Sequence, residues 1–399
     1  MIKLSKIISS SLFINFIIGL VSVNSFAQSS SEDIKTDLFI GQKIKQSKIV
    51  GLAGLIIVDK KVVWSKGYGF SDKENQIPFL PTTIINIASI SKTITGTCLM
   101  QVVESGKLDL DEDINKYLPF LVRNLHFPNA KITLRQLATH TSSIVDQEAY
   151  AKSYHFGGDS PDSLGSFLKS YLEVDGLNYR KENFQNTKPG RNYEYSNIGA
   201  ALAGYIIELA TGEQLSQYSR HSLFEPLKMN STGYFLSEIN KDLHSRLYHV
   251  KDDTVSQIEL YGLTTYPDGG VRTSVEDLAK FFIAMLSIED STEVLKRKSI
   301  DEMMRPQFNE VKKPSNIKLN KENSGIFWSI ENKGTRIGHD GGDPGVNTIM
   351  FYDLSKQVGV ILFVNTSFEN EKKGDRIFAS ISNRLLKLGL SIRKEYIDR

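Results

Sequence analysis

Residues 51–69 decide the fold class, and they read Gly51-Leu-Ala-Gly-Leu-Ile-Ile-Val58, Asp59-Lys60 and Lys61-Val-Val-Trp-Ser-Lys-Gly-Tyr-Gly69. Two β-rich runs joined by a two-residue turn are typical of a β-hairpin. The other β-rich segments lie near the far end of the chain, at Gly325–Glu331, Thr335–His339, Val346–Tyr352 and Val358–Asn365. Strands at both ends of a chain favour one antiparallel sheet that both ends build together.

The long stretch between these strands, about residues 85–320, is predicted to be mostly helix and loop. A closing helix is predicted over Asp375–Leu388, where apolar residues recur at near-helical spacing. We therefore expect an α/β fold of the α+β type, in which helices flank the sheet and a mainly helical lobe is inserted. A cleft between sheet and lobe is the expected place for a ligand site.

The composition is that of a globular protein, because 40% of the 399 residues are hydrophobic and 24% are charged. This balance excludes disordered, collagen-like and low-complexity classes. The formal net charge of +2 gives the chain no overall field that would attract a phosphate backbone or an anionic membrane. We expect no nucleic-acid partner, and the oligomeric state stays open.

The N-terminus has the three parts of a secretory signal peptide. Lys3 and Lys6 give a cationic start, Leu12–Val23 is apolar, and Ser25-Phe26-Ala27 places small residues before a cleavage point. These features predict a signal peptide over residues 1–27, a mature domain over 28–399, and secretion or a periplasmic location. The apolar run is short for a membrane span of about 20 residues, and an uncleaved anchor is the alternative. No later segment is predicted to cross a bilayer.

Metal, disulfide and nucleotide chemistry have no support in the sequence. Cys98 is the only cysteine, so it has no internal disulfide partner, and we expect a small core residue on a helix. The seven histidines do not cluster, and neither a phosphate-binding loop nor a dinucleotide fingerprint is present. We expect no metal and no cofactor.

The first chemical motif is Ser89-Ile90-Ser91-Lys92. Ser89 opens an amphipathic segment that ends at Gly106, as a helix C-cap does, so its hydroxyl and amide lie at the positive end of a helix dipole. Lys92, three residues on, is on the same helix face. The same spacing recurs at Ser166–Lys169, beside a core pair, and at Ser315–Lys318, in a polar loop, and there an ordinary surface position is expected.

A serine hydroxyl becomes a good nucleophile only when a neighbour takes its proton. A free lysine has a pKa of about 10.4 and is protonated at neutral pH. We expect burial beside another cation to lower the pKa of Lys92 by about three units, so that its amine accepts that proton. The alternative is a lysine that points to water, as most helix lysines do.

Two further motifs contain groups that suit acyl transfer. Tyr195-Ser196-Asn197 offers Tyr195 as a proton shuttle and Asn197 as a ligand for a substrate amide. Gly338-His339-Asp340-Gly341-Gly342 ends a predicted strand, and the amides of Gly342 and Ser89 suit an oxyanion hole. Taken singly, each motif has an ordinary alternative: a helix-capping loop for the first, a glycine-rich turn for the second.

Together, in this order and spacing, the three motifs resemble the serine β-lactamase and penicillin-binding protein superfamily, especially its class C-like branch. That branch includes class C β-lactamases, D-alanyl-D-alanine carboxypeptidases, D-aminopeptidases and related esterases. The likeness extends over most of the mature chain, through segments at Gly106–Pro119, Ile132–Ser142, Pro226–Met229 and Pro267–Ser274. The resemblance implies the β-lactamase/transpeptidase-like fold, with Ser89 as nucleophile, Lys92 as its activating partner, Tyr195 as proton shuttle and Asn197 as substrate-amide ligand.

The resemblance also implies substrate contacts at the glycine-rich strand, and there the sequence departs from the family pattern. Gly342 matches the second oxyanion amide, whereas His339 stands where penicillin-binding members have the lysine of Lys-Thr-Gly. At a pKa of about 6.5 a histidine is mostly neutral at pH 7, and Asp340 adds a negative charge. Both changes weaken recognition of a substrate carboxylate. His140, in the Thr-His-Thr-Ser segment, is expected to be structural.

The sequence therefore predicts an exported serine hydrolase that acts on a small ester or a D-amino-acid peptide or amide through an acyl-enzyme on Ser89. The partner is a small molecule or a peptide. A class C-like β-lactamase or a D-alanyl-D-alanine carboxypeptidase is one alternative. A non-catalytic protein that binds cell wall or glycan on the same fold is the other.

Overall fold

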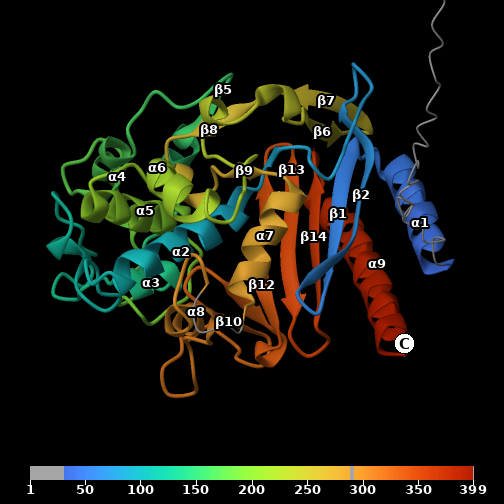
Figure 1. Cartoon of the computed structure of the whole chain (residues 1–399). Coiled ribbons are helices and arrows are strands. Elements are labelled where there is room, and N and C mark those ends of the chain that lie inside the picture. The colour runs from blue at the N-terminus through green and yellow to red at the C-terminus, as the bar shows by residue number, and fades with distance from the viewer. Residues whose placement is uncertain (1–30, 288–291, 399) are drawn as a thin grey trace, which may run out of the picture.

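The computed structural model describes residues 31–287 and 292–398, and both ends of this chain meet in one sheet (Figure 1). The sheet is antiparallel, and its strand order is β10-β11-β12-β13-β14-β1-β2-β3. Its strands are β1 (Gly51–Val58), β2 (Lys61–Asp72), β3 (Ile77–Pro78), β10 (Glu322–Ser324), β11 (Ser329–Glu331), β12 (Arg336–Asp343), β13 (Val346–Asp353) and β14 (Val358–Val364). The expected α+β fold, with a sheet built from both ends of the chain, is confirmed.

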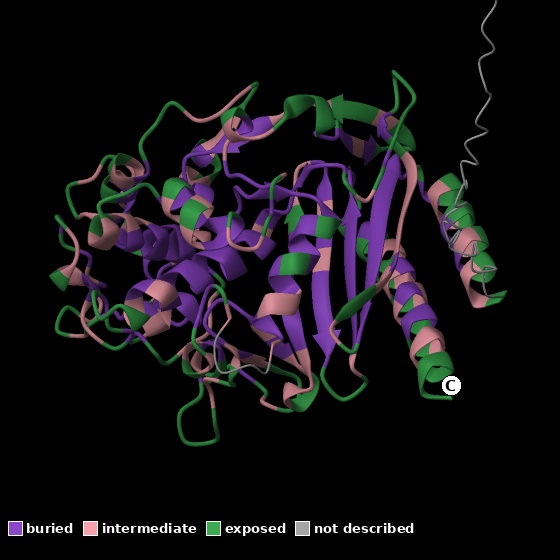
Figure 2. Cartoon of the chain, viewed as in Figure 1, coloured by how far each residue is buried: buried purple, intermediate pink, exposed green. Residues whose placement is uncertain are grey.

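The two ends join where β1 lies against β14, with Leu52 opposite Val364 and Val58 opposite Val358. Every residue of both strands is buried, because helices cover both faces of the sheet (Figure 2). Leu52 packs toward α9 (Glu371–Ile397), on which α1 (Ser31–Ser47) also lies. Alternate residues such as Leu55 face the opposite layer, as the two-residue period of a strand requires.

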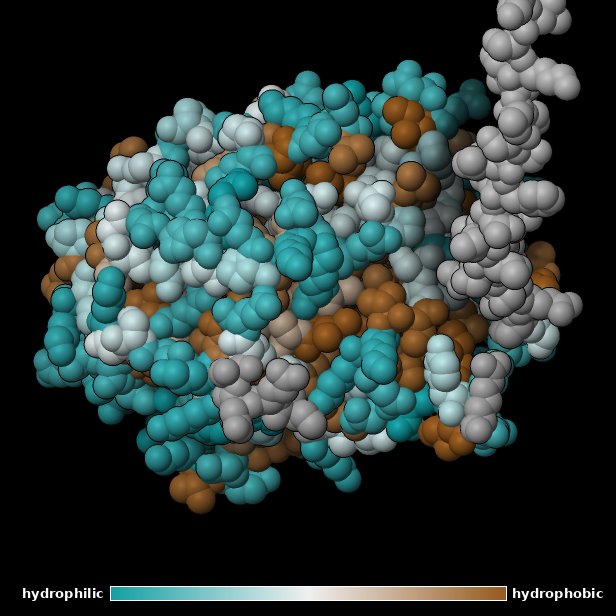
Figure 3. Space-filling view, in the orientation of Figure 1, coloured by the Kyte–Doolittle hydropathy of each residue, from teal (hydrophilic) through white to brown (hydrophobic). Residues whose placement is uncertain are grey.

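That opposite layer consists of α7 (Val275–Met285) and the helical lobe. The lobe is built around α2 (Ser91–Glu104), which contacts α5 (Asn197–Thr211), α6 (Leu215–Ser219) and α8 (Arg297–Met304). The remaining helices are α3 (Leu134–Ala138) and α4 (Leu164–Leu172). Figure 3 shows mostly hydrophilic side chains over the lobe and hydrophobic ones gathered over the strands beside α7.

The chain between the two strand blocks also contains strands that the sequence did not predict. A hairpin of β6 (Leu247–Lys251) and β7 (Thr254–Ile258) forms a small sheet with β15 (Thr366–Phe368). Two-stranded ribbons pair β4 (Ile85–Asn86) with β9 (Arg272–Thr273), and β5 (Tyr154–Phe156) with β8 (Tyr261–Leu263). Strands of two to five residues carry too little periodicity to be distinguished from loop.

The predicted strand over Gly325–Glu331 is wrong in its first half. Residues 325–328 form a bend between β10 and β11, in which Phe327 has φ +57° and its amide donates to the carbonyl oxygen of Ala138. This contact ties the sheet to α3, so tertiary packing overrides the β propensity of an Ile-Phe-Trp run. The closing helix was predicted too short, and α1 was not predicted.

Three further predictions concern Cys98, the N-terminus and membrane spans. Cys98 is fully buried on α2, as expected, with its sulfur 3.3 Å from the Ser219 hydroxyl oxygen. The predicted signal peptide over 1–27 lies outside the described residues, and the domain boundary at 28 stays a prediction. None of the helices in the described ranges is long and apolar enough to cross a bilayer.

Candidate active site

Ser89 lies in a short 3₁₀ turn, Ala88–Ile90, that connects β4 to α2. Its side chain is partly exposed, whereas its neighbours on both sides are buried. The residue before it, Ala88, has φ +47°, a left-handed conformation that a side chain rarely adopts. The Asn86 side-chain oxygen accepts a hydrogen bond from the Ala88 amide at 2.6 Å and holds this turn. Backbone strain of this kind persists only where the surroundings enforce it.

Lys92 is the most enclosed charged side chain of the site, with no exposed surface. Its Nζ lies 3.1 Å from Ser89 Oγ and 2.7 Å from Asn197 Oδ1. A third contact, also 2.7 Å long, reaches the backbone carbonyl oxygen of Asp268. An ammonium group has three N–H donors, and here all three find oxygen acceptors. Three distant stretches of chain thus converge on one amine.

The charge state of Lys92 differs from the expectation. Burial by itself lowers the pKa of Lys92, as predicted. However, coulombic interactions with Tyr195, Asp268 and Asp146, together with hydrogen bonding of the ammonium to the Tyr195 oxygen, outweigh burial, so the pKa of Lys92 lies above its ordinary value. The geometry with three oxygen acceptors fits that direction. Lys92 is therefore an ammonium donor at neutral pH.

Tyr195 and Asn197 are held at the start of α5 by a carboxylate that the sequence did not single out. Asp146 accepts hydrogen bonds from the amides of Asn197, at 2.8 Å, and Ile198, at 3.0 Å, and from the Ser196 hydroxyl. A carboxylate at a helix N-terminus satisfies free amides and favours the helix dipole. An aspartate so close to the Thr-His-Thr-Ser segment was the available signal, but its partners are distant in sequence.

The Tyr195 ring lies between two histidines and the ammonium group. Its centroid is 4.4 Å from that of His140 and 6.4 Å from that of His339. The Lys92 Nζ is 5.0 Å from the same ring centroid. Tyr195 is 36% exposed, so a substrate can reach it. The ring therefore lies beside the Lys92 amine and is open to solvent at once.

His140 has a structural part, as expected. It is buried, and its Nδ1 accepts a hydrogen bond from the Ser196 amide at 3.2 Å. Burial lowers the pKa of His140 well below its ordinary value, with the positive charge of Lys92 as a further cause. A neutral His140 thus holds both the backbone and the ring of the Tyr195 segment.

Strand β12 passes directly beside Ser89, and Gly341 makes the approach possible. A Cβ at Gly341 would lie 2.6 Å from the Ile87 carbonyl oxygen and 2.9 Å from the Ser89 amide nitrogen. No side chain fits into such a gap. By contrast, a Cβ at Gly342 would meet nothing within 4 Å, so open space lies next to that residue. Gly341 is thus the glycine that this close packing requires, and the role of the Gly342 amide stays a prediction.

His339 is buried on the same strand, and its Nδ1 donates to the Asp340 carbonyl oxygen at 2.5 Å. Burial lowers the pKa of His339, the Asp340 charge opposes this, and the Lys92 charge reinforces it. His339 is consequently neutral at pH 7, and Nε2 is the acceptor nitrogen of its ring. The site thus lacks the permanent cation that a lysine here would supply.

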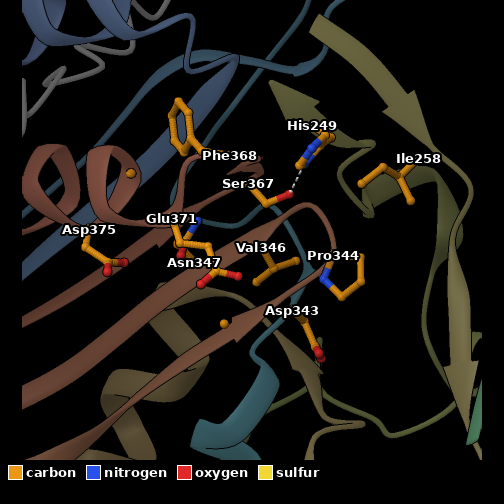
Figure 4. A pocket seen from close by; sticks show the side chains of 12 residues that line it. His249, Ile258, Asp343, Pro344, Val346, Asn347, Ser367, Phe368, Glu371 and Asp375 are labelled. Atoms are coloured by element: carbon orange, nitrogen blue, oxygen red, sulfur yellow. Dashed lines mark hydrogen bonds between the residues drawn. The ribbon is translucent and has the colours of Figure 1, made fainter. Parts of the chain in front are cut away.

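A cavity of about 510 Å³ opens at the end of β12, next to the space beside Gly342 (Figure 4). The β12–β13 turn, β15 and the start of α9 line it, and at one side the His249 and Ser367 side chains are joined by a 2.9 Å hydrogen bond. Asp343, Glu371 and Asp375 contribute carboxylates to the wall, and no lysine or arginine does. Ser89, Lys92, Tyr195 and Asn197 do not line this cavity, which lies toward α9, whereas Gly341 is the glycine of β12 that faces Ser89.

No metal-binding group of three or more His, Cys, Asp or Glu side chains exists among residues 31–287 and 292–398.

Two buried carboxyl groups near Lys92 were also missed by the sequence reasoning. Burial raises the pKa of Asp268 to about 7 and that of Asp343 to about 6. Asp268 belongs to the quoted Pro267–Ser274 segment, but a sequence does not show that its side chain points inward.

Comparison with known proteins agrees with this geometry. A family model described as Beta-lactamase matches residues 36–381. Protein flp of Staphylococcus aureus (strain MRSA252) is 26% identical over 339 residues, which are 84% of this chain and 63% of flp. This chain therefore spans less than two thirds of the length of that relative.

Solved structures share the fold. The octameric penicillin-binding protein homologue from Pyrococcus abyssi matches with a TM-score of 0.67 at 28% identity, over 83% of this chain and 73% of that chain. D-amino acid amidase from Ochrobactrum anthropi SV3 matches with a TM-score of 0.69 at 21% identity, over 89% of this chain and 98% of that chain. At that identity the second likeness is one of fold alone.

Proposed function

This chain belongs to the beta-lactamase family of serine hydrolases, and on that premise we propose that it is an exported hydrolase that cleaves an ester or amide through an acyl-enzyme on Ser89. One observation carries the proposal: the buried Lys92 amine touches Ser89 Oγ at 3.1 Å and Asn197 Oδ1 at 2.7 Å. A structural lysine has no need of a solvent-accessible serine beside it. A partly exposed serine that contacts a fully buried ammonium is an arrangement suited to nucleophilic catalysis.

In the first half of the reaction, Ser89 Oγ attacks the carbonyl carbon of the substrate. The serine proton passes to the phenolate oxygen of Tyr195, which the Lys92 ammonium stabilises from nearby. The carbonyl π electrons move to oxygen, and the amides of Ser89 and Gly342 stabilise the resulting oxyanion. The tetrahedral intermediate collapses, the leaving group takes the proton from Tyr195, and an acyl ester on Ser89 remains.

In the second half, water attacks the acyl ester and gives its proton to Tyr195. A second oxyanion forms and collapses, the acid product leaves, and Ser89 Oγ recovers its proton from Tyr195. Lys92 keeps its protons throughout and acts as a hydrogen-bond donor to Ser89 and Asn197. This assignment keeps Tyr195, the predicted proton shuttle, as the base and removes Lys92 from the proton transfer in which the sequence had included it.

The substrate we propose is a small ester or a D-amino-acid amide. A neutral His339 gives no fixed cation for a substrate carboxylate. Substrates with a free carboxylate at this end, which include β-lactams and terminal D-alanine peptides, are therefore disfavoured.

The test is turnover and covalent labelling with Ser89→Ala as the control. We expect wild type to hydrolyse p-nitrophenyl acetate and to be labelled by a fluorophosphonate at Ser89, and Ser89→Ala to do neither. Labelling at another residue would overturn the site. Absence of turnover in wild type, across esters, D-amino-acid amides and nitrocefin, would favour a non-catalytic binding protein instead. A nitrocefin rate matching class C β-lactamases would reverse the substrate preference.

Export is part of the same proposal and rests on the signal-peptide pattern of residues 1–27. When the full chain is expressed in a Gram-negative host, we expect the mature N-terminus to be Gln28 and the protein to appear in the periplasm. N-terminal sequencing of the fractionated protein measures both. An intact Met1 on membrane-bound protein would instead indicate an uncleaved anchor.

A further inference from the structure

The turn that contains the Asp268 carbonyl oxygen, the third acceptor for Lys92, is hydrogen-bonded to α2. Three hydrogen bonds join this 3₁₀ turn, Tyr266–Asp268, and the residues after it to the first two turns of α2. Thr95 Oγ1 donates to the Pro267 carbonyl at 2.7 Å, Lys92 Nζ to that of Asp268 at 2.7 Å, and the Val271 amide to Ser91 Oγ at 3.0 Å. The Asp268 backbone therefore has no freedom to move away from the amine.

The same turn is wedged against α5 on its other side. A Cβ at Gly204 of α5 would lie only 2.3 Å from the Pro267 Cβ, so the Pro267 ring packs directly on the backbone of the helix. Helix α5 begins at Asn197, which itself accepts a hydrogen bond from Lys92. The turn and both helices thus form one rigid unit around the amine.

The Asp268 side chain is buried within this unit, with 1% of its surface exposed. Its Oδ1 accepts a hydrogen bond from the Tyr150 hydroxyl at 3.1 Å, and its Oδ2 has no hydrogen-bond partner among the described residues. A buried carboxylate with one unsatisfied oxygen is unfavourable unless a nearby positive charge offsets the lost solvation. Burial raises the pKa of Asp268, and the Lys92 charge is the main influence that lowers it.

Lys92 is the buried cation whose positive charge compensates the Asp268 carboxylate. The other buried cation nearby, Arg272, donates to the carbonyl oxygens of Tyr234, Gly270 and Tyr261, and its charge acts on Asp343. The titratable and charged groups that face Lys92 and Asp268 from the surrounding elements are Asp146, His140, Tyr150, Tyr154, Tyr195, Arg272, His339 and Asp343.

We propose that Asp268 is a positioning residue of this site: its backbone carbonyl orients the Lys92 amine, and its buried carboxylate keeps that amine protonated. The catalytic part of this inference rests on the proposed function, whereas the electrostatic effect of Asp268 on Lys92 does not depend on it. With Asp268 ionised, the amine stays a donor to Ser89 and Asn197, and the proton of Ser89 goes to Tyr195. Without that charge, the buried amine loses its proton at a lower pH and becomes a competing acceptor.

The experiment is a titration of Lys92 in the intact protein, with lysine labelled at Cε by carbon-13 and followed by NMR. The Lys92 resonance is identified as the one missing from Lys92→Met. Asp268→Asn keeps the backbone carbonyl and an acceptor for Tyr150 but removes the charge. We expect the midpoint for Lys92 to fall by about one pH unit or more in this variant. Asp353→Asn, which removes a carboxylate at the far end of β13, is the matched control and leaves the midpoint in place.

Folding of each variant is checked by thermal denaturation, and Asp268→Ser, a smaller neutral replacement, serves if Asp268→Asn does not fold. An unchanged Lys92 midpoint in a folded neutral variant would overturn the inference. Activity is a separate readout: in Asp268→Asn the rate of fluorophosphonate labelling should fall above pH 8 more steeply than in wild type. A shifted midpoint in a protein that cleaves no ester or amide would leave this inference standing and refute the proposed function.

Discussion

The segments Ser89–Lys92 and Ser166–Lys169 carry the same Ser-x-x-Lys spacing on a helix, and only the first of them is built as a site. At Ser89–Lys92 the amine is fully buried and contacts the serine, Asn197 and Asp268. At Ser166–Lys169, on α4, both side chains are exposed, and Lys169 pairs with Glu173 at 3.7 Å. The Ser166 amide merely donates to the Ser163 hydroxyl that caps the helix.

The Ser-x-x-Lys spacing therefore places two side chains on one helix face and determines nothing else about their surroundings. The first turn of α2 is enclosed by α5, β12 and the turn at Tyr266–Asp268, which together provide acceptors and remove water. The first turn of α4 faces solvent, where a surface ion pair contributes about 0–1 kcal/mol. The same residue types therefore give a reactive group in one place and an ordinary surface in the other.

The largest effect is expected from removing the two serines in turn. Ser89→Ala should lower ester hydrolysis on the order of 10⁴-fold or more, because the acyl-enzyme cannot form. Ser166→Ala should leave turnover unchanged. Steady-state hydrolysis of p-nitrophenyl acetate measures both. Equal losses in the two variants would remove the distinction between the segments.

The two lysines give the next largest contrast. Lys92→Met should lower kcat/KM by about 10²–10⁴-fold, because Tyr195 and Ser89 lose the ammonium that stabilises the transferring charge. Lys169→Met should have no effect on kcat/KM and change the free energy of unfolding by less than about 0.5 kcal/mol. Urea denaturation is the second measurement. A Lys92→Met protein that keeps full activity would show that the amine is only structural.

A third prediction concerns Gly341, the residue of β12 that packs against the Ser89 segment. Gly341→Ala should lower kcat/KM by about 10²-fold, because the new methyl group pushes β12 away from the Ser89 amide and misplaces the oxyanion donors. The control is Gly41→Ala in the middle of α1, where a Cβ meets nothing within 4 Å. It should stabilise the fold by up to about 1 kcal/mol and leave activity unaltered.

The smallest expected effect is on the pH dependence of the free energy of unfolding, and it distinguishes a buried histidine from an exposed one. Burial lowers the pKa of His244 to about 3, and its Nε2 lacks a partner among the described residues. The unfolded chain then binds the proton more strongly than the folded chain does. The stabilisation is complete above pH 6.5, and the free energy of unfolding should fall by up to about 1.4 kcal/mol for each pH unit below it, per such histidine.

Urea denaturation between pH 7 and pH 5 measures this slope. His244→Asn should reduce the slope, whereas His221→Asn, at a half-exposed position beside Glu213, should not. His140 contributes in the same direction, since burial lowers its pKa as well. A slope that is identical in wild type and His244→Asn would contradict the assignment.

Much of the candidate site was predictable from local sequence. The hairpin over residues 51–69, the β12 glycines and the position of Ser89 at the start of α2 follow from patterns within a few residues. The bend at Gly325–Trp328 was not predictable, because its conformation depends on a hydrogen bond to Ala138 on α3. Asp146 and Asp268 were missed for the same reason: their partners lie on other elements.

From the sequence alone, the family resemblance and the sheet built from both chain ends could be predicted, and Ser89, Lys92, Tyr195 and Asn197 could be named as candidate site residues. Only the tertiary structure decided the charge of Lys92, because a pKa depends on every charge and on the solvent within a few ångströms, whatever its place in the chain. Burial favours a neutral amine, whereas interactions with Tyr195, Asp268 and Asp146 favour an ammonium. Once the chain folds, these interactions outweigh burial, and the lysine donates its protons instead of accepting one.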